Sequence, residues 1–160
     1  DKILLNTHQY INKRLISELA LRLGSQAVVV GIDARRVDET THVTYSHCGT
    51  KEQEVSPTEA AKIAESEGAG EIVITSIDRD GTLEGYDLEL ISKVTETVRI
   101  PVIASGGAKD SNCFVDAVQK SGASAVAAGA LFHFTELTPD DVRTAMRDAG
   151  IPVRQVLHND

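Results

Sequence analysis

Acidic side chains stand where two apolar segments of this sequence end. Asp33 directly follows the apolar run Ala27 to Ile32. An acid at the end of a buried strand can act as a general acid or base, and it can equally cap the turn beneath it. Asp78 and Asp80 belong to an Asp-Arg-Asp-Gly-Thr segment, which fits an Asp-Gly turn or an active-site loop that binds hydroxyl groups. The sequence leaves both interpretations open at each position.

Two glycine turns follow the last two apolar runs. They are Ser105-Gly106-Gly107-Ala108 and Ala128-Gly129-Ala130. Glycines leave backbone N–H groups uncovered, and such groups, with a helix N-terminus behind them, cradle a phosphate. In many eight-stranded α/β barrels the last two strands supply this site. Although glycine is also common in tight turns, the matching placement predicts that the chain binds a phosphorylated small molecule, or inorganic phosphate or sulfate.

The histidines and cysteines lack the spacing of a metal site. His42, His47 and Cys48 share one polar loop, but their spacing matches no common zinc pattern. Cys48 and Cys113 do not make a disulfide framework, and they are typical of reduced thiols in a cytoplasmic protein. We predict neither a metal nor a cofactor.

Positioning these groups requires a parallel sheet, and the apolar runs predict one. Five short runs, most of them rich in Val and Ile and none strictly alternating, indicate strands buried on both faces. They span residues 3–5, 27–32, 71–77, 102–104 and 125–128. Ligands of parallel α/β sheets bind beyond the carboxyl ends of the strands, which is where the acids and glycines stand.

Amphipathic helices are predicted between the strands. Apolar residues recur at helical spacing in 12–23, 86–97 and 111–121, and capped helix starts at Ser56 and Thr138 open two more. The polar stretch 37–55 shows no helical period, and only residues 42–45 within it suggest a small added strand. Strands that alternate with helices predict one α/β domain over residues 1–160, built as a partial TIM (β/α)8 barrel.

Length and charge narrow the interpretation further. The chain has 160 residues, whereas a (β/α)8 barrel takes roughly 250. We therefore expect the C-terminal, half-like part of such a barrel, with about five parallel strands. The net charge of −8 disfavours nucleic acid and anionic membrane surfaces as partners, and no segment is long and apolar enough for a membrane span.

Several motifs together resemble the cyclase subunit of imidazole glycerol phosphate synthase, a barrel enzyme of histidine biosynthesis. The most specific is the run Thr75-Ser76-Ile77-Asp78-Arg79-Asp80-Gly81-Thr82. The others are Gly24 to Val30, Ile32-Asp33, Gly68 to Glu71, Ala104 to Ala108, and Phe132-His133. Their order and spacing agree with the family's fourth strand to its eighth helix, over nearly the whole chain.

The resemblance implies an ammonia-dependent lyase or cyclase reaction. The family combines a phosphoribosyl aminoimidazole-carboxamide substrate with ammonia and gives imidazole glycerol phosphate and an aminoimidazole ribonucleotide. A glutaminase subunit docked at the N-terminal face of the barrel supplies the ammonia, and the sequence leaves open whether one docks here. Asp33 matches the family's fifth-strand catalytic aspartate, whereas its first-strand aspartate has no counterpart. We therefore expect little or no activity from the isolated chain.

The resemblance also assigns binding residues. The positions that match the family's substrate and phosphate pocket are Asn6, Thr7, Thr75, Asp80, Gly81, Ser105, Gly106, Gly107, Ala128 and Gly129. Lys2 and Glu71 match two members of a charged ring at the barrel floor, which is the family's ammonia gate. Lys109 and Ala130 depart from the family's Gly and Ser, which changes the backbone approach to a phosphate and removes one hydroxyl contact.

Two further hypotheses stay open. The segment Gly85 to Ile91 also resembles paralogues in surface-polysaccharide synthesis, which work with a similar amidotransferase on a sugar nucleotide. The other hypothesis is a non-catalytic half-barrel that binds phosphate and associates with itself. A five-stranded piece of a barrel has two open edges and one uncovered face, which predicts a homodimer or a larger assembly.

Overall fold

The chain forms a mixed, mostly parallel sheet, described for residues 1–154 by a computed structural model. The strands are β1 (Ile3–Leu5), β2 (Val28–Arg36), β3 (His42–Ser46), β4 (Lys51–Glu52), β5 (Glu71–Ser76), β6 (Val102–Ser105) and β7 (Ala125–Val126). Their order is β4-β3-β2-β5-β6-β7, and β1 pairs with the first part of β2. The strands β1, β2, β5, β6 and β7 pair in parallel and overlap the five predicted runs, which confirms that part of the prediction, although β2 continues four residues beyond its run, to Arg36.

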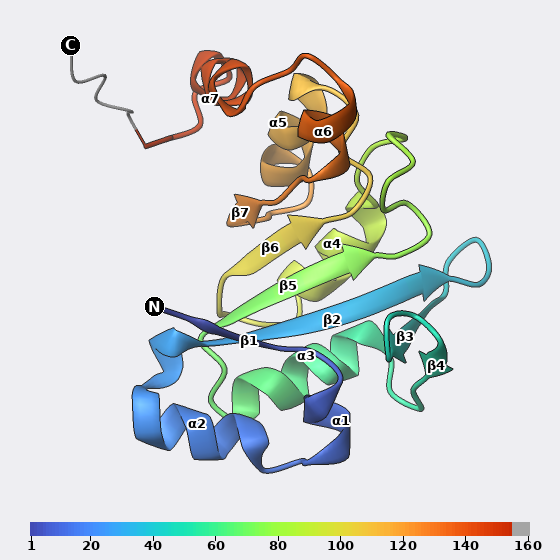
Figure 1. Cartoon of the computed structure of the whole chain (residues 1–160), viewed down its shortest axis with the longest axis vertical. Coiled ribbons are helices and arrows are strands. Elements are labelled where there is room, and N and C mark those ends of the chain that lie inside the picture. The colour runs from blue at the N-terminus through green and yellow to red at the C-terminus, as the bar shows by residue number, and fades with distance from the viewer. Residues whose placement is uncertain (155–160) are drawn as a thin grey trace.

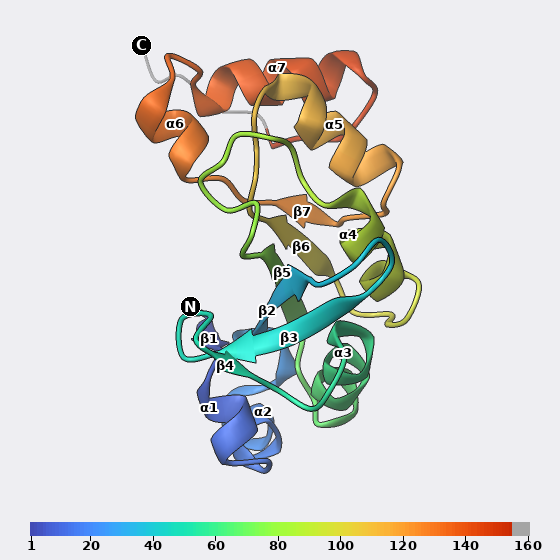
Figure 2. The same cartoon turned by 90° about the vertical axis from the view of Figure 1, so that its right-hand side faces the viewer.

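Helices connect the parallel strands (Figure 1). They are α1 (His8–Ile11), α2 (Leu15–Leu23), α3 (Pro57–Ser66), α4 (Leu88–Thr95), α5 (Ser111–Gln119), α6 (Ala130–Phe134) and α7 (Pro139–Asp148), with a 3-10 turn at Ser25–Ala27. Figure 2 shows α3, α4 and α5 on the same side of the sheet, so three successive connections share one face. Within residues 1–154, no helix combines the length and the apolar character that a membrane crossing requires.

The face of the sheet beneath these helices carries the core. Val28, Val30 and Ile32 of β2 are fully buried there, and so are Ile72 and Ile74 of β5. These residues alternate along their strands because successive side chains of a strand point to opposite faces. Burying one such side chain contributes roughly 1.5–3 kcal/mol, so this layer is a large part of the hydrophobic stabilisation.

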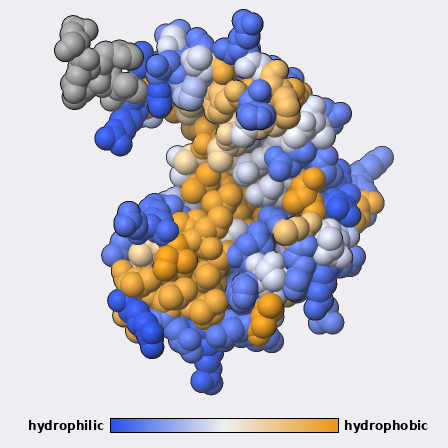
Figure 3. Space-filling view, in the orientation of Figure 1, coloured by the Kyte–Doolittle hydropathy of each residue, from blue (hydrophilic) through white to orange (hydrophobic). Residues whose placement is uncertain are grey.

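The opposite face of the sheet is not fully buried, although the sequence predicts strands buried on both faces. Every second residue of β5 and β6 is only half-buried there, and Leu4 of β1 is 60% exposed. Figure 3 shows apolar side chains extending across this side of the sheet. The prediction of two buried faces therefore holds for β2 alone, because no layer of helices covers this side of the central strands within residues 1–154.

The predicted capped helix starts are confirmed. Ser56 and Thr138 each accept a hydrogen bond from the backbone N–H three residues later, and Glu59 and Asp141 accept one in return from the backbone of the capping residue. The helices expected over 12–23, 86–97 and 111–121 correspond to α2, α4 and α5, each shorter than its pattern. The sequence does not predict α1 and α6, because four or five residues are too few to show a helical period.

The polar stretch 37–55 is a hairpin rather than an open loop. The expected small strand is β3, which pairs antiparallel with β2, and β4 then pairs with β3. In the turn between β3 and β4, His47 and Cys48 adopt left-handed backbone angles, with φ of 52° and 56°. The N–H of His47 donates to Thr7 Oγ1 at 2.9 Å, so the hairpin turn lies beside the segment that follows β1.

Candidate functional site

Three predicted site residues form a row across the carboxyl ends of the parallel strands. Asp33 on β2 pairs in register with Thr75 on β5, and Thr75 pairs with Ser105 on β6. Residues paired in this way present their side chains to the same face of a sheet. All three are half-buried, whereas the following residues Ala34 and Ser76 are buried toward the helices. The row therefore lies on the helix-free face, at the edge where parallel α/β folds bind ligands.

Asp33 is a carboxylate with a raised pKa. Burial raises its pKa, the charge of Asp80 raises it further, and the neighbouring Asn6 side chain opposes part of the rise. Asp33 and Asp80 are thus close enough to interact, although they come from different strand ends. A carboxyl group with a raised pKa keeps a proton to higher pH, which suits a group that exchanges protons with a substrate.

Two buried polar atoms on this side of the site have no hydrogen-bond partner. They are Oδ1 of Asn6 and the hydroxyl of Tyr10. Burial raises the pKa of Tyr10 far above its ordinary value, and the charge of Asp33 adds to the effect. Gly31 leaves room for Asn6, because a Cβ at Gly31 would lie 3.3 Å from Asn6 Nδ2. Since buried polar atoms are normally paired, these two atoms provide hydrogen-bonding capacity that no protein group within residues 1–154 uses.

A pocket of about 320 Å³ lies between the two glycine turns. Its lining consists of Asp80, Gly81, Ser105, Gly106, Gly107, Ala108, Ala127, Ala128, Gly129, Ala130 and Leu131. Most of the predicted phosphate-binding residues are in this lining, but Asn6, Thr7 and Thr75 are not. Among residues 1–154, no cationic side chain lines the pocket, so an anion bound there would depend on backbone N–H groups.

The backbone of the pocket leaves such N–H groups available. Gly106 and Gly107 have φ of 89° and 100°, values that side-chain-bearing residues rarely adopt. A Cβ on Gly107 would lie 2.5 Å from the carbonyl oxygen of Gly85, so only glycine fits at this position. Within residues 1–154, the amides of Gly106, Gly107, Gly129 and Ala130 donate to no protein acceptor. Successive amides in turns of this kind form anion-binding concavities.

The remaining predicted residues lie elsewhere. Thr7 uses its hydroxyl to accept the N–H of His47. Lys2 and Glu71 form an ion pair. Glu71 opens β5, four residues before Thr75, so this pair marks the amino-terminal end of the sheet, opposite the row that contains Asp33.

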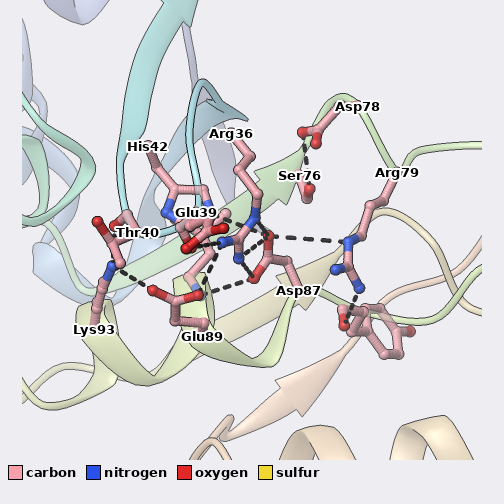
Figure 4. Close-up of polar contacts among 12 residues, drawn as sticks. Arg36, Glu39, Thr40, His42, Ser76, Asp78, Arg79, Asp87, Glu89 and Lys93 are labelled. Atoms are coloured by element: carbon pink, nitrogen blue, oxygen red, sulfur yellow. Dashed lines mark hydrogen bonds and ion pairs between the residues drawn. The ribbon is translucent and has the colours of Figure 1, made fainter.

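A buried ionic cluster near the site is not apparent from the sequence. Asp87, whose side chain is 1% exposed, accepts hydrogen bonds from Arg36 Nη2 at 2.9 and 3.0 Å and lies 3.0 Å from His42 Nε2 (Figure 4). It also caps α4 by accepting the Leu90 N–H at 3.0 Å. Desolvation alone would raise the pKa of Asp87, but these hydrogen bonds hold it well below its ordinary value. The one signal in the sequence is an aspartate directly before a helical pattern.

The side chains of His42, His47 and Cys48 do not surround a common point. His42 is buried against Asp87, whereas His47 and Cys48 lie in the hairpin turn. Within residues 1–154, no group of three or more His, Cys, Asp or Glu residues could hold a metal ion. Cys48 is exposed, Cys113 is buried in α5, and both are free thiols.

These features define an α/β protein of the barrel type, with its ligand site at the strand ends. They are the parallel sheet, the row of polar side chains at its carboxyl ends and the glycine-lined pocket. The chain belongs to the histidine biosynthesis protein family, whose model matches residues 1–138. This membership confirms the family expected from the sequence motifs.

Curated relatives bear a more specific name. The chain is 45% identical over 156 residues to "Imidazole glycerol phosphate synthase subunit HisF" of Hyphomonas neptunium (strain ATCC 15444), which aligns 98% of this chain with 62% of the relative. It is also 45% identical over 161 residues to the protein of the same name from Corynebacterium glutamicum (strain R), with 97% and 62% aligned. The chain is thus homologous to HisF over most of its own length and spans 62% of the length of these relatives.

Proposed function

We propose that this chain carries a substrate-phosphate site and one catalytic acid of a cytoplasmic imidazole glycerol phosphate synthase cyclase. The substrate is a phosphoribosyl aminoimidazole-carboxamide, which reacts with ammonia to give imidazole glycerol phosphate and an aminoimidazole ribonucleotide. The observation that carries the proposal is the pocket whose unpartnered amides lie beside the row containing Asp33. The relationship to HisF subunits supports this choice of substrate.

Each predicted residue has a role in this proposal. Asp33 transfers protons, because it lies at the strand ends beside the pocket and its raised pKa favours a carboxyl group that can hold a proton. Gly106, Gly107 and Gly129 bind the phosphate through their amides, with Gly81 and Ala128 shaping the pocket. Asp80, Thr75 and Ser105 bind substrate hydroxyl groups next to Asp33, and Asn6 and Thr7 approach from the β1 side. The ion pair of Lys2 and Glu71 stands at the end of the sheet where the family admits ammonia.

Phosphate binding by the pocket can be tested directly. Titration of the chain with inorganic phosphate, followed by calorimetry or by amide NMR shifts, should give saturable binding that perturbs Gly107 and Gly129. The variant Gly129→Val should abolish this binding with little loss of stability. A Cβ at Gly129 meets no atom within 4 Å and the local φ of −120° is not left-handed, so the added bulk can occupy the pocket without a clash at its Cβ.

A matched control is Ala125→Val, which adds bulk at an exposed position of β7 outside the pocket. It should bind phosphate like the unmodified chain. Undiminished phosphate binding by Gly129→Val would mean that the anion binds elsewhere and that the pocket has another purpose.

Catalysis requires a separate measurement. Because the family's first-strand aspartate has no match in this chain, we expect ammonia-dependent turnover by the chain alone to be lower by roughly 10²–10⁴-fold than with both acids present. Any residual turnover should disappear in Asp33→Asn. Turnover that survives this substitution would remove Asp33 from the proposed proton transfer.

We also propose that two copies of the chain associate through the uncovered side of the sheet. Leu4 and Ile3 of the edge strand β1 are 60% and 41% exposed, and an open strand edge with apolar side chains favours pairing with a second copy. Light scattering should show a dimer or larger, and Leu4→Lys should give a monomer. Leu21→Lys is the control, because Leu21 is 88% exposed but belongs to the helix α2 and not to a strand edge. A monomeric unmodified chain would refute the pairing.

A further inference from the structure

We propose that Asp87 is a positioning residue for the phosphate pocket and acts on it through Arg79 and the segment Gly85–Tyr86. The inference rests on the proposed function of that pocket. Asp87 does not line the pocket itself. Its influence therefore depends on a chain of contacts that starts in the buried ionic cluster and ends at both glycine turns.

The first step in this chain is the fixed place of Asp87. Arg36 donates to both of its carboxylate oxygens, His42 Nε2 lies 3.0 Å from Oδ2, and the Leu90 N–H donates to Oδ1. Arg79 approaches the same carboxylate, with its Nε 3.9 Å from Oδ2 (Figure 4). A buried carboxylate held by several donors keeps one position, because any shift would leave a charged group unpaired.

The second step is the clamp made by Arg79. Its Nη1 donates to the carbonyl oxygens of Gly85 at 3.1 Å and Tyr86 at 2.9 Å. The guanidinium group is planar and rigid, so a carboxylate near its Nε also orients its Nη1. Arg79 and Gly85 stand at the two ends of the loop that carries Asp80. The Arg79 side chain thus links the two ends of this loop, and Asp87 orients that side chain.

The third step connects this segment to both glycine turns. The N–H of Gly85 donates to the carbonyl oxygen of Gly107 at 2.6 Å, which joins the segment to the turn after β6. The hydroxyl of Tyr86 donates to the carbonyl oxygen of Ala127 at 2.9 Å, which joins it to the turn after β7. Gly107 and Ala127 both line the pocket. One segment therefore fixes the distance between the two walls that would hold the phosphate.

The packing around Tyr86 leaves little freedom for this segment to find another position. The Tyr86 side chain is buried and meets the ring of Phe114 edge-on, with ring centroids 5.6 Å apart. The open side of Gly107 lies against the Gly85 carbonyl and the Cβ of Arg79. A small displacement of Gly85 and Tyr86 would therefore be transmitted to the pocket and not absorbed by a cavity.

The substitution Asp87→Asn tests the proposal. Asparagine can still cap α4, but it lacks the charge that holds Arg79 and Arg36. Glu89→Gln is the matched control, because Glu89 also pairs with Arg36, at 2.9 Å, but it is 41% exposed and makes no ion pair with Arg79. Both variants change one carboxylate of the same cluster to an amide.

We expect Asp87→Asn to raise the dissociation constant for inorganic phosphate about fivefold to tenfold, and Glu89→Gln to leave it within about twofold. Hydrogen exchange of the Gly85 amide, which reports the bond to Gly107, should become faster in Asp87→Asn than global unfolding accounts for. If Asp87→Asn does not fold, Arg79→Gln tests the same chain of contacts from a side chain that is 32% exposed.

The outcomes separate the two proposals. A folded Asp87→Asn variant with lower thermal stability but unchanged phosphate affinity and unchanged local exchange at Gly85 would overturn the positioning role. If the unmodified chain binds no phosphate, the proposed function of the pocket fails. Exchange at Gly85 still decides in that case whether Asp87 positions the segment.

Discussion

Asp33 lies near the end of β2 and Asp87 at the start of α4, and the surroundings of these two aspartates have opposite effects on their pKa values. Asp33 faces Asp80 and two unpartnered polar atoms, and its pKa is raised. Asp87 is bound by arginine, histidine and a backbone amide, and its pKa is lowered. Burial disfavours the charge in both cases, so the difference comes from the partners.

The two aspartates therefore differ in purpose: the carboxylate of Asp87 stabilises the fold, whereas the carboxylate of Asp33 is available to a ligand. All the charge of Asp87 is committed to protein donors, so it can fix positions but cannot take part in proton transfer. The charge of Asp33 is compensated only in part, by the Asn6 side chain, which lowers stability and leaves the carboxyl group available to a ligand. Perturbed pKa values are frequent at functional sites, but the direction of the shift and its cause indicate which kind of site is present.

The largest expected effect on stability comes from removing the carboxylate of Asp87. Asp87→Ala leaves the charge of Arg36 without its buried partner and removes the cap of α4, so the free energy of unfolding should fall by about 3 kcal/mol. Urea denaturation measures the change. Glu89→Ala, which removes an exposed partner of the same arginine, should cost far less. Equal losses in the two variants would mean that Asp87 is not the centre of the cluster.

Lowering the pH should remove the stabilising contribution of Asp87 in the unmodified chain. Because the pKa of Asp87 is lowered in the native state, its stabilising contribution is complete above its ordinary value of 3.8 and is lost as the pH falls below it. A loss of roughly 2 kcal/mol between neutral and strongly acidic pH is the scale for one paired aspartate. Asp87→Asn should lack this part of the acid dependence, and an unchanged profile would contradict the assignment.

A smaller effect is expected on the side of Asp33. Tyr10→Phe removes a buried hydroxyl that has no partner, so the free energy of unfolding should stay unchanged or rise by up to about 1 kcal/mol. Thermal denaturation measures the change, with Tyr86→Phe as the control. The Tyr86 hydroxyl donates a hydrogen bond to the carbonyl oxygen of Ala127, so its removal should lower the free energy of unfolding. A clear destabilisation by Tyr10→Phe would show that its hydroxyl has a partner after all.

The smallest expected effect is that of Asp33→Asn on stability. The raised pKa of Asp33 means that its ionisation opposes folding above its ordinary value of 3.8, and this penalty disappears as the pH falls toward that value. The variant should therefore be slightly more stable at pH 7, by about 0.5 kcal/mol because solvent screens a half-buried group, and equally stable near pH 3. Chemical denaturation at both pH values measures this, and a loss of stability at pH 7 would place Asp33 with Asp87 as a structural group.

Local patterns in the sequence were sufficient for most of the fold. The Val- and Ile-rich runs predict the parallel strands, and the Ser56 and Thr138 caps predict two helix starts, because these signals depend on neighbours a few residues away. The strand β4, with two residues, and the helices α1 and α6 are too short for such a signal. The prediction of two buried faces was wrong for β5 and β6, since an apolar run does not show how many layers will cover it.

The candidate site was predictable in part for the same reason. Glycine turns after the last strands and an acid directly after the apolar run 27–32 are local signals, and the strand register then brings Asp33, Thr75 and Ser105 into one row. The partnership of Arg36 and Asp87 joins residues 51 positions apart, and neither residue is unusual in its own segment. Such long-range pairing depends on the path of the chain, so composition and spacing did not reveal it.

The order of strands in the sheet has a consequence for how the chain reaches its native state. From β2 onward the parallel strands β2, β5, β6 and β7 are neighbours in the order in which the ribosome produces them. Each new strand and helix can therefore add to a surface that already exists, without waiting for a distant segment. Because β2 pairs with β1, β3 and β5, it is the natural nucleus of folding, and the two-residue strand β7 should join last and detach first under tension.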